Sequence, residues 1–80
     1  MLTAGQIRGA RGLVDWSQSK LAEETKLSVQ TIKRMEGMRG PEASTPANVQ
    51  AVRRALENAG IVFLDAKENK EGGAGVRLKK

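Results

Sequence analysis

The stretch SQSKLAEETKLSVQTIKRME, residues 17–36, decides the fold that we expect for this chain. Its spacing predicts two short helices joined by a tight turn. Ser17 and Ser28 are each placed to cap one of them, because a serine hydroxyl can accept a backbone N–H from the first helical turn. The apolar positions expected to hold the two helices together are Leu21, Ala22, Leu27, Ile32 and Met35.

The second helix of this pair, expected over about residues 28–37, has one polar side. Side chains on that side can reach base edges and phosphates. The pattern is that of a helix-turn-helix, whose second helix enters the major groove of DNA. A plain helical hairpin in an all-α domain is the alternative, since it needs neither the two caps nor a polar outer face. The polar side is formed by Val29, Gln30, Lys33 and Arg34.

The composition restricts what a chain of 80 residues can do. It contains no His and no Cys, which removes thiol nucleophiles, Ser-His pairs, disulfides and ordinary zinc sites. We therefore expect no enzymatic activity, no cofactor and no metal. The longest apolar run, Ile61–Leu64, is too short to cross a membrane. Because the N-terminal residues lack the apolar segment of a signal peptide, we expect a cytoplasmic, nucleoid-associated protein without a membrane partner.

The charge balance favours a polyanionic partner. Fourteen Lys and Arg residues oppose nine Asp and Glu residues, which gives a net charge of +5. Basic residues that neutralise phosphates release the counterions of DNA, so a basic excess promotes binding to it. One basic cluster falls in or beside the second helix, with only Glu36 opposing it: Lys26, Lys33, Arg34 and Arg39. Another lies at the C-terminus: Arg77, Lys79 and Lys80.

Further helices are expected on both sides of this pair. Thr3 and Gln6 form a capping box for a helix over residues 3–14. Gly37 to Pro41 predicts a helix stop and a loop, and Thr45-Pro46 begins a fourth helix. We expect buried stripes at Ile7, Ala10, Leu13 and Val14, and at Val49, Val52, Ala55, Leu56 and Ala59, with Trp16 as a core anchor.

Two strands complete the expected fold. Ile61–Leu64 is β-branched and aromatic at its start, and residues 76–79 alternate apolar with basic side chains. They are expected to pair as a hairpin around a loop over residues 66–75. The fold class is therefore mainly α: a compact bundle of about four short helices with a helix-turn-helix, over residues 1–60, plus a C-terminal two-stranded β segment, over residues 61–80.

The motifs WSQSKLA, residues 16–22, and LSVQTIKRMEG, residues 27–37, resemble the Xre/Cro-like phage-repressor family of helix-turn-helix proteins. The resemblance extends over residues 3 to about 60 and implies a helical bundle that acts as a dimer on operator DNA. It implies that Gln18 contacts a phosphate and braces the recognition helix, and that Arg11 and Glu36 form a structural ion pair. The groove-facing positions that it implies are Ser28, Val29, Gln30 and Arg34.

Two positions depart from the family pattern. Lys26 occupies the turn where the family usually has Gly, and Asp15 replaces a common Gly before Trp16. A left-handed Lys26 would cost ~1 kcal/mol, whereas a different turn shape would tilt the recognition helix. Asp tolerates the left-handed conformation better. We also expect Lys33 and Arg39 to bind phosphates with Gln18, because they lie beside or just after the groove-facing surface.

These features predict a sequence-specific transcriptional regulator that binds double-stranded operator DNA, most economically a dimeric repressor that occludes a promoter. A homodimer is expected because the base contacts of one helix discriminate too little to find one site among millions. An antitoxin or accessory protein that binds a second protein through its C-terminal strands is the alternative.

The C-terminal strands are the expected dimerisation element. The helical core looks complete without them, and an uncovered two-stranded ribbon is unstable. A hairpin folded back on its own fourth helix, with a dimer formed only on DNA, is the alternative. The side chains expected to build the interface are Ile61, Val62, Phe63, Leu64, Val76 and Leu78.

Overall fold

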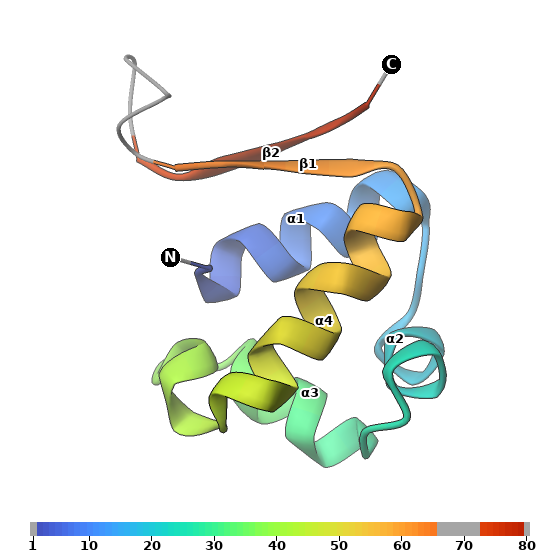
Figure 1. The fold of residues 1–80 in the computed structure, drawn as a ribbon. Helices are drawn as coiled ribbons and strands as arrows, with labels where there is room; N and C mark the ends of the chain where they lie inside the picture. The colour runs from blue at the N-terminus through green and yellow to red at the C-terminus, as the bar shows by residue number, and fades with distance from the viewer. Residues whose placement is uncertain (1, 66–72, 80) are drawn as a thin grey trace.

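The structure, a computed structural model, describes residues 2–65 and 73–79 (Figure 1). Over these residues the chain forms a mainly α bundle followed by one antiparallel strand pair, which confirms the expected fold class. None of the helices in the described part has the length and apolar character needed to cross a membrane. The elements are α1 (Ala4–Val14), α2 (Gln18–Thr25), α3 (Val29–Met35), the 3₁₀ turn η1 (Gly40–Ala43), α4 (Pro46–Asn58), β1 (Ile61–Leu64) and β2 (Gly75–Leu78).

The boundaries differ slightly from those expected. Ser28 caps α3 from outside the helix, which ends at Met35, and β2 begins one residue earlier than predicted and ends at Leu78. Instead of a plain loop, Gly40–Ala43 forms η1, because the ring of Pro41, near its start, restricts φ to helical values. Gly40 itself has a φ of +70°, which glycine adopts without a Cβ penalty. Part of the expected hairpin loop, residues 66–72, lies outside the described residues, as does Lys80.

Side-chain caps start the four α-helices. In each case a hydroxyl accepts a hydrogen bond from the backbone N–H three residues further on. At α1 the Gln6 carboxamide also accepts from the Thr3 N–H at 2.8 Å, which completes the predicted capping box. The caps are Thr3, Ser17, Ser28 and Thr45.

Two helices end at left-handed residues that are not glycine. Asp15 has a φ of 61° after α1 and Lys26 has a φ of 62° after α2. The N–H of Leu27, the residue after Lys26, donates to the Ala22 carbonyl at 3.1 Å. This hydrogen bond back to the last turn of α2 is typical of a helix that ends at a left-handed residue. The turn between α2 and α3 therefore keeps the glycine-type geometry although a lysine occupies it.

The core is built from every helix and from the sheet. Its fully buried large side chains come from α1, α2, α3 and α4: Ile7, Leu21, Ile32, Met35, Val52 and Leu56. Leu2, outside the predicted stripes, is also buried. Trp16 and Val14 pack against this core, as expected of an anchor and a stripe position. Leu13 is an exception to the predicted stripe of α1, because it lies at the rim of the core with 42% of its surface exposed.

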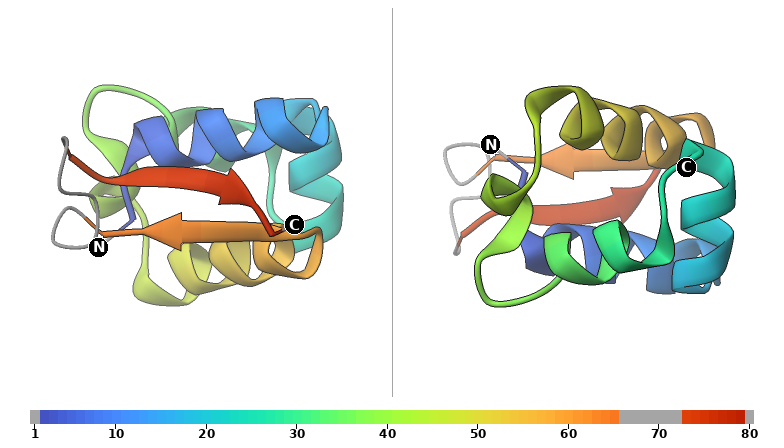
Figure 2. Two further views of the ribbon diagram at one scale, coloured as in Figure 1. Left: turned by 90° about the horizontal axis from the view of Figure 1, so that it is seen from above. Right: turned by 90° about the horizontal axis from the view of Figure 1, so that it is seen from below.

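The strand pair covers α1 and α4 on the side away from α3 (Figures 1 and 2). The strands are antiparallel, with Ile61 opposite Leu78 and Phe63 opposite Val76. Ile61 and Phe63 are buried in the same core as the helices. The expectation that the helical core is complete without the strands is therefore wrong, because these two side chains seal the space between α1 and α4.

Two residues of α1 hold the hairpin in place. The buried Gln6 donates from its amide to the carbonyls of Leu64, at 3.1 Å, and Gly75, at 3.0 Å. Gly9 lets β2 approach, since a Cβ at that position would stand 3.2 Å from the Val76 side chain. The hairpin thus folds onto its own chain.

Candidate nucleic-acid interface

The helix-turn-helix consists of α2, the turn at Lys26 and Leu27, and α3. Ala22 on α2 is 5% exposed, and this small side chain lets α3 pass close over it. Leu27 is half-buried in the turn, and Ile32, on the inner side of α3, is completely buried. These contacts hold α3 with one side against the core and the other toward solvent.

The solvent side of α3 is polar and basic. Gln30, Lys33 and Arg34 are exposed there, as the sequence predicted. Ser28 is also exposed, but its hydroxyl is engaged with the backbone N–H and the hydroxyl of Thr31. Val29 is half-buried and packs against the core, so its methyl groups are only partly accessible.

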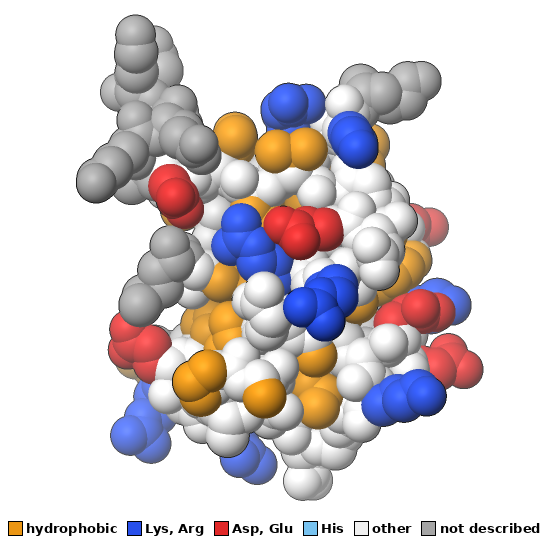
Figure 3. Space-filling model, in the orientation of Figure 1, with side chains coloured by type: hydrophobic (Ala, Val, Ile, Leu, Met, Phe, Trp, Pro, Cys, Tyr) orange, Lys and Arg blue, Asp and Glu red, His pale blue; other side chains and the backbone are white. Residues whose placement is uncertain are grey.

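The basic side chains around α3 form no ion pair with the described acidic residues. Among residues 2–65 and 73–79, no carboxylate pairs with any of the four. Figure 3 shows Lys and Arg side chains at the lower end of the visible face, where η1, α3 and α2 lie in Figure 1, with Asp and Glu side chains above them at either side. A positive surface without internal partners attracts phosphates. The four exposed residues are Lys26, Lys33, Arg34 and Arg39.

The end of α3 is fixed by the carboxylate of Glu36, which is buried. Arg11 reaches it from α1 with two hydrogen bonds, Nε to Oε2 at 2.7 Å and Nη2 to Oε1 at 2.9 Å. This is the ion pair that the resemblance implies. The hydrogen bonds to Glu36 raise the pKa of Arg11 against the opposing effect of burial, so Arg11 remains a cation. Its Nη1 also donates to the Trp16 carbonyl at 2.9 Å, which secures the segment before α2.

Gln18 joins this cluster at the start of α2. Its Nε2 donates to Oε1 of Glu36 at 3.1 Å, which provides the bracing contact implied by the resemblance. An amide nitrogen carries two hydrogens, so one remains for a phosphate. Arg8, which is not among the predicted site residues, donates from its guanidinium to the Glu36 backbone carbonyl. No local signal marks that contact, because it joins residues 28 positions apart.

The structure also places the remaining predicted residues. Arg39 is exposed in the loop after α3, next to Met38, whose side chain is completely exposed. Of the predicted dimerisation residues, Ile61 and Phe63 are buried within the chain, and Leu78 is 44% exposed. Val62, Leu64 and Val76 are half-buried.

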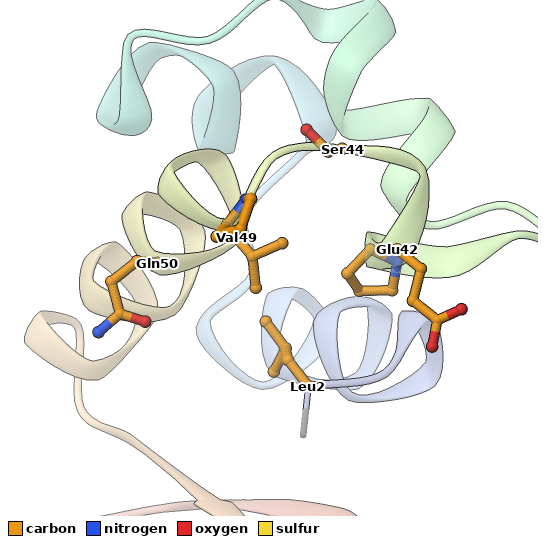
Figure 4. Close-up of a pocket in the computed structure, with 7 residues that line it drawn as sticks. Leu2, Glu42, Ser44, Val49 and Gln50 are labelled. Carbon is orange, nitrogen blue, oxygen red and sulfur yellow. The ribbon is translucent and has the colours of Figure 1, made fainter.

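A hollow of about 550 Å³ lies between the N-terminal ends of α1 and α4 and the turn η1 (Figure 4). Among the described residues that line it, Glu42 is the only charged one, and the hydroxyl of Ser44 accepts a hydrogen bond from the Asn48 amide at 2.9 Å. Its described lining combines apolar side chains with these polar ones. It consists of Leu2, Pro41, Glu42, Ser44, Pro46, Val49 and Gln50.

Comparisons with protein-family models, with curated proteins and with solved structures found no match to this chain.

Proposed function

We propose that this protein is a sequence-specific DNA-binding transcriptional regulator that acts as a dimeric repressor by occupying a promoter. The observation that carries the proposal is the two-sided character of α3. Ile32 and Met35 are completely buried on one side of this helix. The other side exposes Gln30, Lys33 and Arg34 next to basic residues that have no internal ion pair among the described residues.

The exposed side chains of α3 match the chemistry of base edges. Gln30 is suited to bidentate hydrogen bonds with adenine, and Arg34 to the two acceptors of guanine. Each such contact discriminates against a wrong base by ~1–3 kcal/mol. Ser28 and the accessible part of Val29 supply a hydroxyl and a methyl contact. Gln18, Lys33 and Arg39 hold phosphates and so position α3 in the groove.

Selection of binding sites from a random pool of duplex DNA by the full chain tests this function. Because two copies act together, we expect enrichment of inverted repeats whose half-sites lie about one helical turn, ~34 Å, apart. Competition with unrelated duplex DNA at physiological salt separates specific from electrostatic binding. A pool that shows no enrichment, or equal binding of all sequences, would contradict the proposal.

The position of the hairpin restricts how two copies pair. The sheet lies on the side of the molecule away from α3, so a dimer through its outer face would point the two recognition helices in opposite directions (Figure 1). We therefore propose pairing through the open edge of β2, about a two-fold axis normal to the sheet. That arrangement turns both copies of α3 toward the same duplex.

Apolar side chains flank this edge. Val76 approaches α1 at Gly9, and α1 and β2 run in the same direction (Figure 2). Four residues along a helix and two along a strand cover similar distances, about 6 Å. Leu13 and Leu78, both more than 40% exposed, are therefore expected at the same level along the edge, one on α1 and one on β2.

Leu78→Lys is expected to convert a dimer into a monomer in solution. A lysine on an edge strand opposes pairing with another strand, and here it adds to the positive charge of Arg77 and Lys79. Sedimentation without DNA measures this, and binding to a full two-half-site operator should weaken by at least about tenfold, since avidity is lost. Met38→Lys makes the same change at an exposed methionine of the loop after α3 and should leave the dimer intact. Dimeric Leu78→Lys protein would contradict this interface.

The alternative occupant of the same edge is a second protein that adds a strand to the sheet. It predicts a parent chain that sediments as a monomer alone and as a heteromeric complex with the product of a neighbouring gene.

A further inference from the structure

The turn between α2 and α3 contains a residue whose backbone conformation its own side chain disfavours. Lys26 has φ 62° and ψ 28°, and its N–H donates to the Glu23 carbonyl at 3.3 Å. The left-handed region is costly for residues with a Cβ and free of that cost for glycine. A glycine here would meet the same turn geometry without strain.

No contact within the described chain accounts for the lysine. Its side chain is exposed and takes part in none of the ion pairs formed by residues 2–65 and 73–79. Of the two carboxylates on α2, Glu24 pairs with Lys20 at 2.8 Å, and Glu23 forms no ion pair with Lys26. The ammonium group of Lys26 is therefore available to an external anion.

The place of Lys26 indicates which anion. It lies two residues before Ser28, and exposed positions alternate with half-buried ones from Lys26 to Gln30. The lysine thus enters solvent beside the start of α3, which carries Gln30, one of the proposed base-reading residues. A duplex bound there would bring the phosphates that border the groove within reach of a four-carbon side chain.

We propose that Lys26 is a phosphate-binding residue of the DNA interface, and that its charge accounts for a lysine at a position where glycine would be less strained. This inference rests on the proposed function. Strained residues that persist without internal compensation are candidates for a functional role. The proposal makes a specific prediction: replacing Lys26 with glycine, which relieves the strain, must also weaken DNA binding.

Lys26→Gly is the decisive variant, since loss of binding cannot then be attributed to loss of fold. We expect a melting temperature at or above that of the parent, together with a salt dependence of operator binding whose slope, d log K/d log[salt], is smaller in magnitude by about 0.9, one phosphate contact. Lys26→Arg keeps the charge and should keep the parental slope.

Arg54→Ala is the matched control, because it removes one positive charge from the exposed side of α4 and should leave the slope unchanged. The affinities are measured on the selected operator and on an unrelated duplex, and Lys26→Gly should weaken both by the same factor. If the parent binds its operator but Lys26→Gly keeps the parental slope, the assignment of Lys26 is wrong and the proposed function stands. If the parent selects no DNA sequence, both fail.

Discussion

Replacing Arg11 with methionine is expected to lower the free energy of unfolding by about 3–5 kcal/mol, which is comparable to the whole stability of a domain of this size. The reason is the environment of Glu36, whose side chain is 3% exposed. Without the guanidinium, this carboxylate loses two hydrogen bonds and stays buried, and among the described residues the Gln18 amide is its one remaining side-chain donor. Urea denaturation followed by circular dichroism measures the change.

Arg53→Met is the matched control for this prediction. Arg53 also forms an ion pair, with Glu57 at 3.0 Å, but both side chains are at least one-third exposed. Loss of this pair and of the stacking of Arg53 on Phe63 should cost no more than about 2 kcal/mol. An Arg11→Met protein that also carries Glu36→Leu should recover part of the loss, because no carboxylate is then buried without a counterion. Coincident unfolding curves for the parent and Arg11→Met would show that the pair contributes nothing.

Replacing Gln30 or Arg34 with alanine is expected to remove ~1–3 kcal/mol of discrimination at particular base pairs while leaving the fold intact. Both side chains are exposed on α3, so their removal opens no cavity in the core. Binding is measured by titration of the selected operator and of operators that carry single base-pair changes. Each variant should lose its sensitivity to base-pair changes at the positions that the removed side chain reads, and should stay sensitive to changes at the others.

Lys33→Ala separates base reading from phosphate binding on the same helix. This variant should bind all sequences more weakly by a similar factor and reduce the magnitude of the salt slope by about one. If Gln30→Ala and Arg34→Ala both retain the parental base preference at every position, the assignment of Gln30 and Arg34 as base readers is wrong. An unchanged salt slope in Lys33→Ala would remove that residue from the phosphate contacts.

Local chemistry made much of this fold predictable. The four hydroxyl caps, the capping box of Thr3 and Gln6, and the proline after Thr45 all act within about three residues of a helix start. The apolar spacing of residues 17–36 likewise determines which side of α3 is buried and which side exposes Gln30, Lys33 and Arg34. Because these signals are short-range, they can be read from the order of residues alone.

The tertiary structure decided the features that depend on distant residues. Gln6 bonds to carbonyls 58 and 69 positions away, and Arg8 reaches the end of α3, although neither contact leaves a pattern in the sequence. Apolar character alone did not show that Ile61 and Phe63 complete the core of the chain itself, or that Leu13 remains at its rim. The alternation of apolar residues along a strand, or their helical repeat along a helix, identifies the apolar side of that element. The surface that covers this side depends on how the elements pack.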